Sequence, residues 1–398
     1  MQLRISDAEL GRRRRIVLAE METNKLNGYV FWNSTSIFYL SGFKFLPTER
    51  PLGAFLTSDD HLVAFVPRLE LEHATETGRF DRVISYPEYP GPRHPMLQLG
   101  DALREAGLGT GTLGADADGY PGRAGYMGPR LSEVMDGARV SLDHARLVES
   151  LRVCKTADEI ELIRESTRWG NLAHALLQSY TRAGLTETEI ASRASLEATA
   201  AMVRTLGPGF ESRTGGENSA IALFRGQIGP NSALPHAINK NIRLQRGDVL
   251  VTGAVSWVFG YGSELERTMF VGEPSAEQAR FFRHAYELQE VAFRTIRPGR
   301  PCADVDREVR RYYEENDLMP YWRHHVGHNL GLEGHERPFL DIGDESILQP
   351  GMVFSIEPGL YVPGLGGFRH SDTIVVTEGG MEMVTYYPRD LESMICGV

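Results

Sequence analysis

The chain has 398 residues, of which 41% are hydrophobic and 24% charged, and its 42 Lys and Arg against 53 Asp and Glu give a formal net charge of −11. This composition is typical of a globular protein, and the length predicts two or three domains. The acidic balance excludes non-specific binding of nucleic acid and leaves no basic excess to hold the chain on an anionic membrane. Three cysteines without a CxxC pair disfavour a disulfide framework or a zinc site. Because no apolar run reaches the length of a membrane span and the N-terminus lacks a signal-peptide core, we expect a cytoplasmic protein.

The first 150 residues alternate between helical and strand-like segments. Ser6 is a candidate cap for a helix that continues into 12–25, and the basic run at 12–15 is expected on its solvated face. Strands are expected at 29–32, 52–57, 62–67 and, after a Gly-rich turn, within 107–116, with a further helix at 101–106. This alternation predicts a small α/β domain over 1–155.

The second half begins with strong helical periodicity directly after a boundary that we expect near residue 155. Helices are expected at 157–177, 186–202, 276–296 and 302–316. At the start of the second of these helices, Thr186 and Glu189 have the spacing of a capping box. Each pair of helices is followed by strand-rich sequence, so 156–398 is expected to form a duplicated α+β domain.

Histidines and acids gather in the second half, where the predicted strands end. The clusters lie at 235–236, 263–268, 324–338, 355–359 and 367–373. Taken singly, each histidine or glutamate has a plain explanation as a packed or surface residue. Together with glycines that permit close approach of the backbone, they are the material for general acid–base catalysis or a metal site.

The order and spacing of these motifs resemble the pita-bread family, which includes methionine aminopeptidase, prolidase, aminopeptidase P and creatinase. The most specific matches are the Gly-His-Asn-Leu-Gly-Leu, His-Glu-Arg-Pro, Leu-Gln-Pro-Gly-Met and Ile-Glu-Pro-Gly segments at 327–332, 335–338, 348–352 and 356–359. The resemblance covers nearly the whole chain. It implies a small α/β domain, like that of prolidase and creatinase, in front of the duplicated pita-bread catalytic domain.

The resemblance breaks at the metal site. The peptidases of the family hold two divalent metals on Asp, Asp, His, Glu and Glu. The matching positions here are Gly253, Glu264, His328, Glu357 and Ser371. Two carboxylates are absent, and Asp372 cannot replace one because the next residue of a strand faces the other side. Since the remaining three residues hold one ion at most, a dinuclear peptidase is disfavoured, and we expect neither a bound metal nor another cofactor.

Creatinase is the family member that works without metal, and several positions resemble it. Glu266, in Leu-Glu-Arg-Thr, matches the glutamate that grips the guanidinium of creatine, and Glu357 matches the second substrate glutamate. His236 matches the histidine that shuttles the proton. Arg50 matches an arginine that comes from the partner subunit and binds the substrate carboxylate, a task for which its planar fork is suited. The resemblance therefore implies a homodimer.

These observations predict a metal-independent, creatinase-like hydrolase that cleaves a C–N bond of a small carboxylate-bearing substrate. His236 is expected to be the general acid and base, Glu266 and Glu357 to stabilise the polarised C–N group, and His328 and His335 to donate hydrogen bonds. The expected substrate-binding residues are Arg50, Glu264, His324, Arg337 and His370. Two alternatives stay open: an Xaa-Pro aminopeptidase- or dipeptidase-like metallohydrolase with a degenerate site, and a non-catalytic peptide-binding pseudoenzyme.

Overall fold

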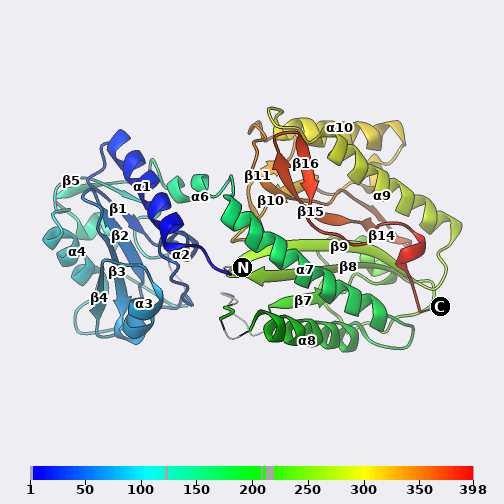
Figure 1. Ribbon diagram of the computed structural model, residues 1–398, viewed down its shortest axis with the longest axis horizontal. Coiled ribbons are helices and arrows are strands. Elements are labelled where there is room, and N and C mark those ends of the chain that lie inside the picture. The colour runs from blue at the N-terminus through cyan, green and yellow to red at the C-terminus, as the bar shows by residue number, and fades with distance from the viewer. Residues whose placement is uncertain (1–2, 122–123, 208, 212–218, 398) are drawn as a thin grey trace. The chain divides into compact units, whose positions relative to one another are not determined.

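The computed structural model describes residues 3–121, 124–207, 209–211 and 219–397 (Figure 1). The chain divides into two compact units, Arg4–Arg152 and Val153–Val398. Each unit has its own sheet and its own set of buried apolar side chains. Within the described part of the chain, no helix is long and apolar enough to cross a membrane.

The N-terminal unit is built on a six-stranded mixed sheet with the strand order β4-β3-β2-β1-β5-β6. Its strands are β1 (Gly28–Phe31), β2 (Gly53–Thr57), β3 (Leu62–Pro67), β4 (Arg82–Tyr86), β5 (Gly111–Ala115) and β6 (Ala138–Ser141). β2 is antiparallel to β1 and β3, whereas β3 and β4, β1 and β5, and β5 and β6 pair in parallel. Every residue of β1, β2 and β3 is buried, which explains the continuous apolar runs of these strands.

The helices of this unit are α1 (Asp7–Thr23), α2 (Ser34–Ser41), α3 (Leu71–Thr77), α4 (Pro95–Glu105), α5 (Leu131–Val134) and α6 (Leu147–Leu151). α1 begins at the predicted cap, because the Ser6 hydroxyl accepts a hydrogen bond from the Glu9 amide at 3.2 Å. The expectation that the basic run is solvated is wrong at Arg13, which is 1% exposed. Its guanidinium lies 3.9 Å from the centre of the Tyr39 ring and donates to the Tyr39 carbonyl oxygen at 2.9 Å.

The C-terminal unit is built on a nine-stranded sheet. The main path of the sheet is β11-β10-β12-β15-β9-β8-β7, with β16 paired to β15 and β17 paired to β9. Its strands are β7 (Ala220–Leu223), β8 (Val249–Val258), β9 (Tyr261–Val271), β10 (Gly327–Asn329), β11 (Glu336–Leu340), β12 (Val353–Ile356), β15 (Ser371–Thr377), β16 (Gly380–Met383) and β17 (Ile395–Cys396). A separate two-stranded sheet joins β13 (Gly359–Val362) and β14 (Gly366–Arg369).

The register of the central strands brings distant parts of the chain together. Gly253 on β8 lies opposite Glu266 on β9, and Ser371 on β15 lies opposite the same glutamate from the other side. His328 on β10 lies opposite Ser355 on β12. The sheet therefore collects the sequence clusters that were singled out for chemistry.

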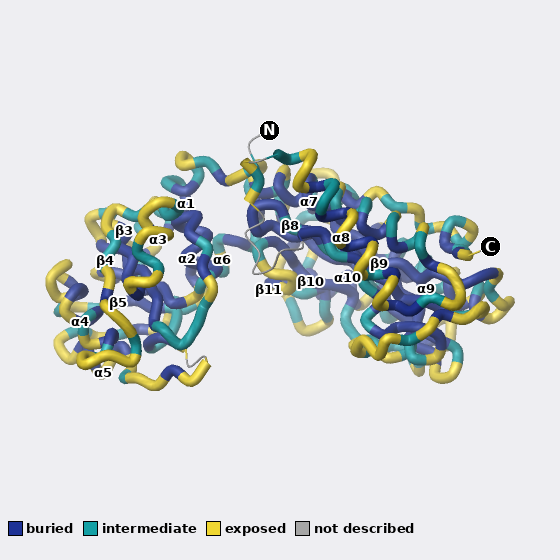
Figure 2. Tube along the Cα trace, turned by 90° about the horizontal axis from the view of Figure 1, so that it is seen from below, coloured by how far each residue is buried: buried dark blue, intermediate teal, exposed yellow. Residues whose placement is uncertain are grey.

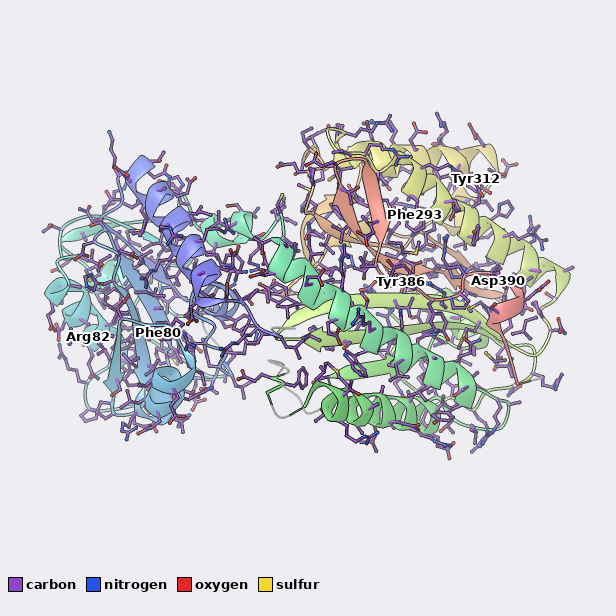
Figure 3. The ribbon with its side chains drawn as sticks, viewed as in Figure 1. Phe80, Arg82, Phe293, Tyr312, Tyr386 and Asp390 are labelled. Atoms are coloured by element: carbon purple, nitrogen blue, oxygen red, sulfur yellow. The ribbon has the colours of Figure 1, made fainter. Side chains whose placement is uncertain are left out.

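The helices of this unit are α7 (Ala157–Tyr180), α8 (Glu187–Leu206), α9 (Ala276–Thr295) and α10 (Cys302–Glu315). The capping box predicted for α8 is present, with the Thr186 amide 2.8 Å from Glu189 Oε2 and the Glu189 amide 3.3 Å from Thr186 Oγ1. α7 packs on β8 and β9, α8 packs on α7 and β7, and α9 packs on α10 and β14 (Figure 1). The labels of Phe293 and Tyr312 locate α9 and α10 in Figure 3. Each helix pair is followed by strands of the one sheet, so the predicted duplicated α+β order is confirmed.

Candidate active site

Three side chains from the larger sheet converge and form what we call the acid–histidine triad. Glu264 lies on β9, His328 on β10, and Glu357 directly follows β12. His328 Nε2 is 3.3 Å from Glu357 Oε1 and 4.0 Å from Glu264 Oε2. One possible ligand atom from each residue lies within 4.8 Å of the other two. The strands around the triad are buried along most of their length, as the dark tube in Figure 2 shows for β8 and β9.

The imidazole of His328 has a fixed orientation. Its Nδ1 donates to the Asn329 carbonyl oxygen at 3.2 Å, so Nε2 faces the two carboxylates. Nε2 is buried and has no aligned hydrogen-bond partner among the described residues. Burial by itself would lower the pKa of His328, but Glu357 and Glu264 outweigh it and raise that pKa to about 9. A field that holds a proton on this nitrogen so strongly also attracts a metal cation.

Two serines orient the first carboxylate of the triad. Glu264 Oε1 accepts hydrogen bonds from Ser355 Oγ at 2.6 Å and Ser371 Oγ at 2.8 Å, which leaves Oε2 turned toward His328. Burial, together with the charge of Glu357, raises the pKa of Glu264. Ser371 therefore supports a carboxylate at the position where the family's peptidases have a ligand.

The second carboxylate of the triad is held ionised. Burial alone would raise the pKa of Glu357, but the contact with His328 and the charge of Arg369 keep that pKa well below its usual range. Arg369 Nε lies 3.8 Å from Glu357 Oε2. The carboxylate is thus available as an anion for a proton or a cation.

Glu266 lies between two arginines. Arg369 Nη2 donates to Glu266 Oε1 at 2.7 Å, and Arg369 Nε lies 2.5 Å from Glu266 Oε2. Arg225 Nη2 lies 2.5 Å from the same Oε1. Burial would lower the pKa of Arg369, but the negative charge of Glu266 raises it well above its usual value. The carboxylate that was expected to grip a substrate guanidinium is therefore already bound by two guanidinium groups of the chain itself.

The network continues from Arg369 to His324. Arg369 Nη1 donates to the Tyr361 hydroxyl at 2.9 Å, and that hydroxyl lies 2.7 Å from His324 Nε2. Because His324 Nδ1 donates to the His325 carbonyl oxygen at 2.8 Å, Nε2 accepts from Tyr361. Burial lowers the pKa of His324 and raises the pKa of Tyr361 to about 12, so both groups stay neutral at pH 7. His324 thus orders the site through Tyr361.

One further predicted histidine, His335, lies against the triad. The His335 ring stacks on the His328 ring, with 3.8 Å between ring centroids and an angle of 19° between the planes. Burial and the positive charge of His328 lower the pKa of His335. His236, in the exposed turn after a 3-10 segment at Gly229–Ala233, is near enough for its charge to lower the same pKa further. The structure thus brings two of the predicted histidines, His328 and His335, into direct contact.

The strand that carries His328 is anchored by a buried lysine. Lys155 Nζ contacts Asn329 Oδ1 and lies 3.1 Å from Glu336 Oε2. The side chains of Lys155 and Glu336 are 1% and 4% exposed. Asn329 Nδ2 donates in addition to the Val153 carbonyl oxygen at 3.3 Å. These contacts tie the first residues of the unit to the neighbour of the triad histidine.

Two residues beside Ser371 face away from the triad because side chains alternate along the strand. His370 is fully buried, and its ring lies 4.9 Å from the Phe282 ring at an edge-on angle of 87°. Asp372 also points to the side of β15 away from the triad, where its Oδ1 accepts a hydrogen bond from Arg267 Nη2 at 2.8 Å. The structure therefore does not bring His370 to the site, and Asp372 faces away as the alternation predicts.

The two expected substrate-binding arginines, Arg337 and Arg50, each contact neighbours within their own unit. Arg337 is exposed, with its guanidinium carbon 5.8 Å from the centre of the Phe339 ring. Arg50 belongs to the N-terminal unit, where its Nε lies 2.7 Å from Glu88 Oε1 and its Nη1 2.5 Å from Glu49 Oε1. Its expected role across a homodimer interface stays a prediction.

Comparison with known proteins assigns the chain first to a class and then to a family. Residues 13–154 match the creatinase/prolidase N-terminal domain, and residues 161–378 match metallopeptidase family M24. The fold is the expected pita-bread fold, and the class is that of hydrolases acting on C–N bonds. Since the second match spans more than half of the chain, the chain belongs to metallopeptidase family M24.

Individual relatives support the same branch of the family. The chain is 28% identical over 374 residues to the Xaa-Pro dipeptidase of Pyrococcus furiosus, covering 93% of this chain and 97% of that protein. It is similar to the solved structure of Dipeptidase PepE from Mycobacterium ulcerans, with 28% identity, a TM-score of 0.81, and coverage of 99% of this chain and 100% of that one. For the prolidase from Pyrococcus furiosus the identity is 25% and the TM-score 0.74, with 93% and 99% covered. The predicted resemblance to the creatinase–prolidase branch and its fold is confirmed.

The expectation of a metal-independent, creatinase-like hydrolase is wrong. The relatives are Xaa-Pro dipeptidases and prolidases of a metallopeptidase family, and the triad keeps a group able to hold a metal ion. Gly253 and Ser371 supply no carboxylate, but Glu264, His328 and Glu357 still lie close enough together to hold one ion. The carboxylate of Glu266, which was expected to bind a substrate guanidinium, is instead bound by two arginines of the chain.

Sequence reasoning gave no role to four polar residues of the site: Arg225, Ser355, Tyr361 and Arg369. Two of them carried a signal, since Ser355 and Arg369 each stand two residues before a position that was singled out, Glu357 and Ser371. Residues spaced by two in extended chain share a side. Arg225 reaches the site from the turn after β7, and Tyr361 reaches it from β13. No spacing in the sequence relates either residue to the predicted site.

Proposed function

We propose that the chain is a metal-dependent peptidase that hydrolyses short Xaa-Pro peptides and holds one divalent ion on the acid–histidine triad. The observation that carries the proposal is the buried Nε2 of His328, which faces two carboxylate oxygens at 3.3 and 4.0 Å without an aligned hydrogen bond. Membership of a metallopeptidase family supports the reaction class, and the relatives named Xaa-Pro dipeptidase and prolidase support the substrate.

The donor set fits a divalent transition metal. One imidazole and two carboxylates suit Zn²⁺ or Mn²⁺, and three protein ligands leave a coordination position open for water or substrate. Ser355 and Ser371 fix the orientation of Glu264 by hydrogen bonds to its Oε1. Such support of a ligand strengthens metal binding.

The surroundings favour one ion rather than two. A second ion about 4 Å from the first needs further carboxylates, and the positions opposite Glu266 hold Gly253 and Ser371 instead. Glu266 itself is neutralised by Arg225 and Arg369. A second divalent charge would therefore meet two guanidinium groups and no free carboxylate.

A bound divalent ion supplies a Lewis acid for the scissile carbonyl and lowers the pKa of water. The chain's own residues orient the substrate and move protons. His335 is neutral at pH 7, because burial and the charge of His328 lower its pKa, so its ring can accept a proton or donate a hydrogen bond. His236, its electrostatic neighbour, is the proposed acid for the leaving nitrogen, and Arg369 keeps Glu357 ionised.

The test combines metal binding with turnover. The full chain is purified without chelators, titrated with Mn²⁺, Co²⁺ or Zn²⁺ in a calorimeter, and assayed with alanyl-proline. We expect one ion per chain, activity that EDTA abolishes, and a loss of at least about 100-fold in metal affinity in Glu357→Gln. The control is Glu382→Gln, because Glu382 is a surface residue paired with Arg164 at 2.7 Å; this variant should keep the metal affinity and the activity of the wild type. Turnover without metal contradicts the proposal, and metal binding without cleavage of any Xaa-Pro peptide favours a non-catalytic peptide-binding protein.

A further inference from the structure

The strand pair beside the two stacked histidines is irregular. On β10 and β11 the pairing shifts directly after His328, so that Asn329 lies opposite Glu336. An irregularity of this kind changes the direction of the side chains next to it. His328 stands directly before one residue of the shifted pair, and His335 stands directly before the other. The position of the pair therefore determines where both imidazole rings point.

A single buried ammonium group holds the shifted pair together. Lys155 Nζ contacts Asn329 Oδ1 and lies 3.1 Å from Glu336 Oε2. The side chains of Lys155 and Glu336 are 1% and 4% exposed, so water cannot take over these contacts. The backbone of the lysine is itself fixed, because the Lys155 amide donates to the Gly351 carbonyl oxygen at 2.8 Å. The ammonium is thus a rigid support for both strands.

The loop of residues 330–335, which joins the two strands, is shaped around the same lysine. A Cβ on Gly331 would lie 2.8 Å from Lys155 Cε, so a larger residue there would displace the lysine side chain. Glu336 Oε1 accepts from the Glu333 amide at 3.1 Å, while its Oε2 faces the ammonium. The carboxylate that pairs with the lysine therefore also fixes the end of the loop that carries His335.

The lysine and the histidines lie on opposite sides of this backbone. Neighbouring side chains in extended chain face opposite sides, and Asn329 and Glu336 face Lys155. The rings of His328 and His335 face the other way and stack with 3.8 Å between their centroids. Because the two rings come from different strands, their stacking depends on the relative position of the two backbones. That position is what the ammonium fixes.

We propose that Lys155 is a positioning residue that fixes the stacked pair of His328 and His335 from the far side of the strands. It acts through the side chains of Asn329 and Glu336. It thereby sets the place of a proposed metal ligand and of the ring proposed to exchange a proton. The expected effect on turnover rests on the proposed function, whereas the expected effect on ring geometry does not.

Three variants separate positioning from stability. Lys155→Met removes the ammonium, Glu336→Gln removes the carboxylate charge, and the double variant leaves neither charge buried. Losing one partner of a buried ion pair is much more destabilising than losing both. In thermal unfolding the double variant should therefore recover much of the stability lost in either single variant. The control is Glu165→Gln on α7, because Glu165 is 6% exposed and lies 2.8 Å from Arg168.

Kinetics with alanyl-proline at saturating Mn²⁺ form the first measurement. We expect the Lys155→Met/Glu336→Gln variant to lower kcat about 10- to 100-fold with a much smaller change in KM, because the groups that act in the chemical step are displaced. Glu165→Gln should keep the kcat of the wild type. If the double variant recovers kcat together with stability, the proposal is overturned, since the lysine is then only a counterion. The double variant and Glu336→Gln keep the test valid if Lys155→Met does not fold.

The metal-free protein gives a second measurement that needs no turnover. Protons held over the face of an aromatic ring are shielded, so the ring protons of His335 should resonate upfield of those of the exposed His61 in NMR spectra of histidine-labelled protein. His335→Gln assigns the signal, and in the double variant this signal should move toward that of His61. If the wild type cleaves no peptide, the proposed function fails, but this shift still supports the positioning role. An unchanged His335 signal in the double variant overturns it.

Discussion

The buried ion pair behind the active site makes the sharpest prediction about stability. Asp372 Oδ1 lies 2.8 Å from Arg267 Nη2 and Oδ2 lies 3.2 Å from Nη1, and both side chains are 0% exposed. Asp372 also accepts from Gln289 Nε2 at 3.0 Å and from Thr385 Oγ1 at 2.7 Å. Asp372→Asn keeps the volume of the side chain but removes its charge, so the buried guanidinium of Arg267 loses its counterion.

The expected cost is large because both charges are fully removed from water. Breaking a buried ion pair by neutralising one partner typically costs about 3–5 kcal/mol. For a unit of this size, each kcal/mol lowers the Tm by about 2–4 °C. Asp372→Asn should therefore lower the Tm of the C-terminal unit by about 10 °C.

Differential scanning calorimetry of the full chain measures this shift. The matched control is Asp390→Asn, whose carboxylate is exposed and accepts from the Ser393 amide at 2.9 Å (Asp390 is labelled in Figure 3). Its unfolding free energy should change by about 0.5 kcal/mol or less. A fall in Tm of less than about 2 °C in Asp372→Asn refutes the reasoning, because the backbone carbonyls around Arg267 would then balance its charge alone.

Three further predictions concern pH, packing and the metal ligands. Burial lowers the pKa of His174 to about 3. Between pH 6.5 and 3 the unfolded chain therefore binds a proton that the folded chain does not, so the free energy of unfolding decreases by about 1.4 kcal/mol for each unit by which the pH falls. Urea denaturation at pH 7 and pH 5 should show a smaller loss in His174→Gln, and an equal loss in both proteins contradicts this cause. A Cβ on Gly327 would lie 1.9 Å from the Ser355 carbonyl oxygen, so Gly327→Ala should destabilise by about 1–3 kcal/mol in thermal unfolding, whereas Gly334→Ala, with open space around it, should not. Replacing Ser355 and Ser371 together by Ala removes both hydrogen bonds to Glu264 Oε1 and should weaken Mn²⁺ binding about 10- to 100-fold in calorimetry; wild-type affinity in the double variant argues against their role in holding the ligand.

Features that depend on neighbouring residues in the chain are predictable from the sequence. The capping box of Thr186 and Glu189 and the cap at Ser6 act within three residues, so composition and spacing suffice. The alternation of a strand likewise predicts that Asp372 faces away from Ser371, and the structure agrees. The same rule applies to His370, which shares a motif with Ser371 but not its side of the strand.

Features that depend on tertiary contacts are not predictable in this way. The guanidinium of Arg13 is buried because Tyr39, which α2 supplies, covers it. Arg225 and Arg369 approach Glu266 from 41 and 103 residues away, and no periodicity links such positions. Family motifs identify the ligand positions, but the number of ions that a depleted site holds depends on which charges surround it in the fold.

The buried lysine beside Asn329 bears on how the catalytic part of the chain can be cut from the rest. A fragment that begins at residue 156, the predicted domain start, lacks Lys155 and leaves Glu336 buried without its ammonium partner. Losing one partner of a buried pair is costly, and here the loss falls next to the strand that carries His328. A minimal catalytic fragment therefore has to begin no later than Val153. The residues at this boundary hold the strand that carries His328, because Val153 and Lys155 bind Asn329 and Glu336.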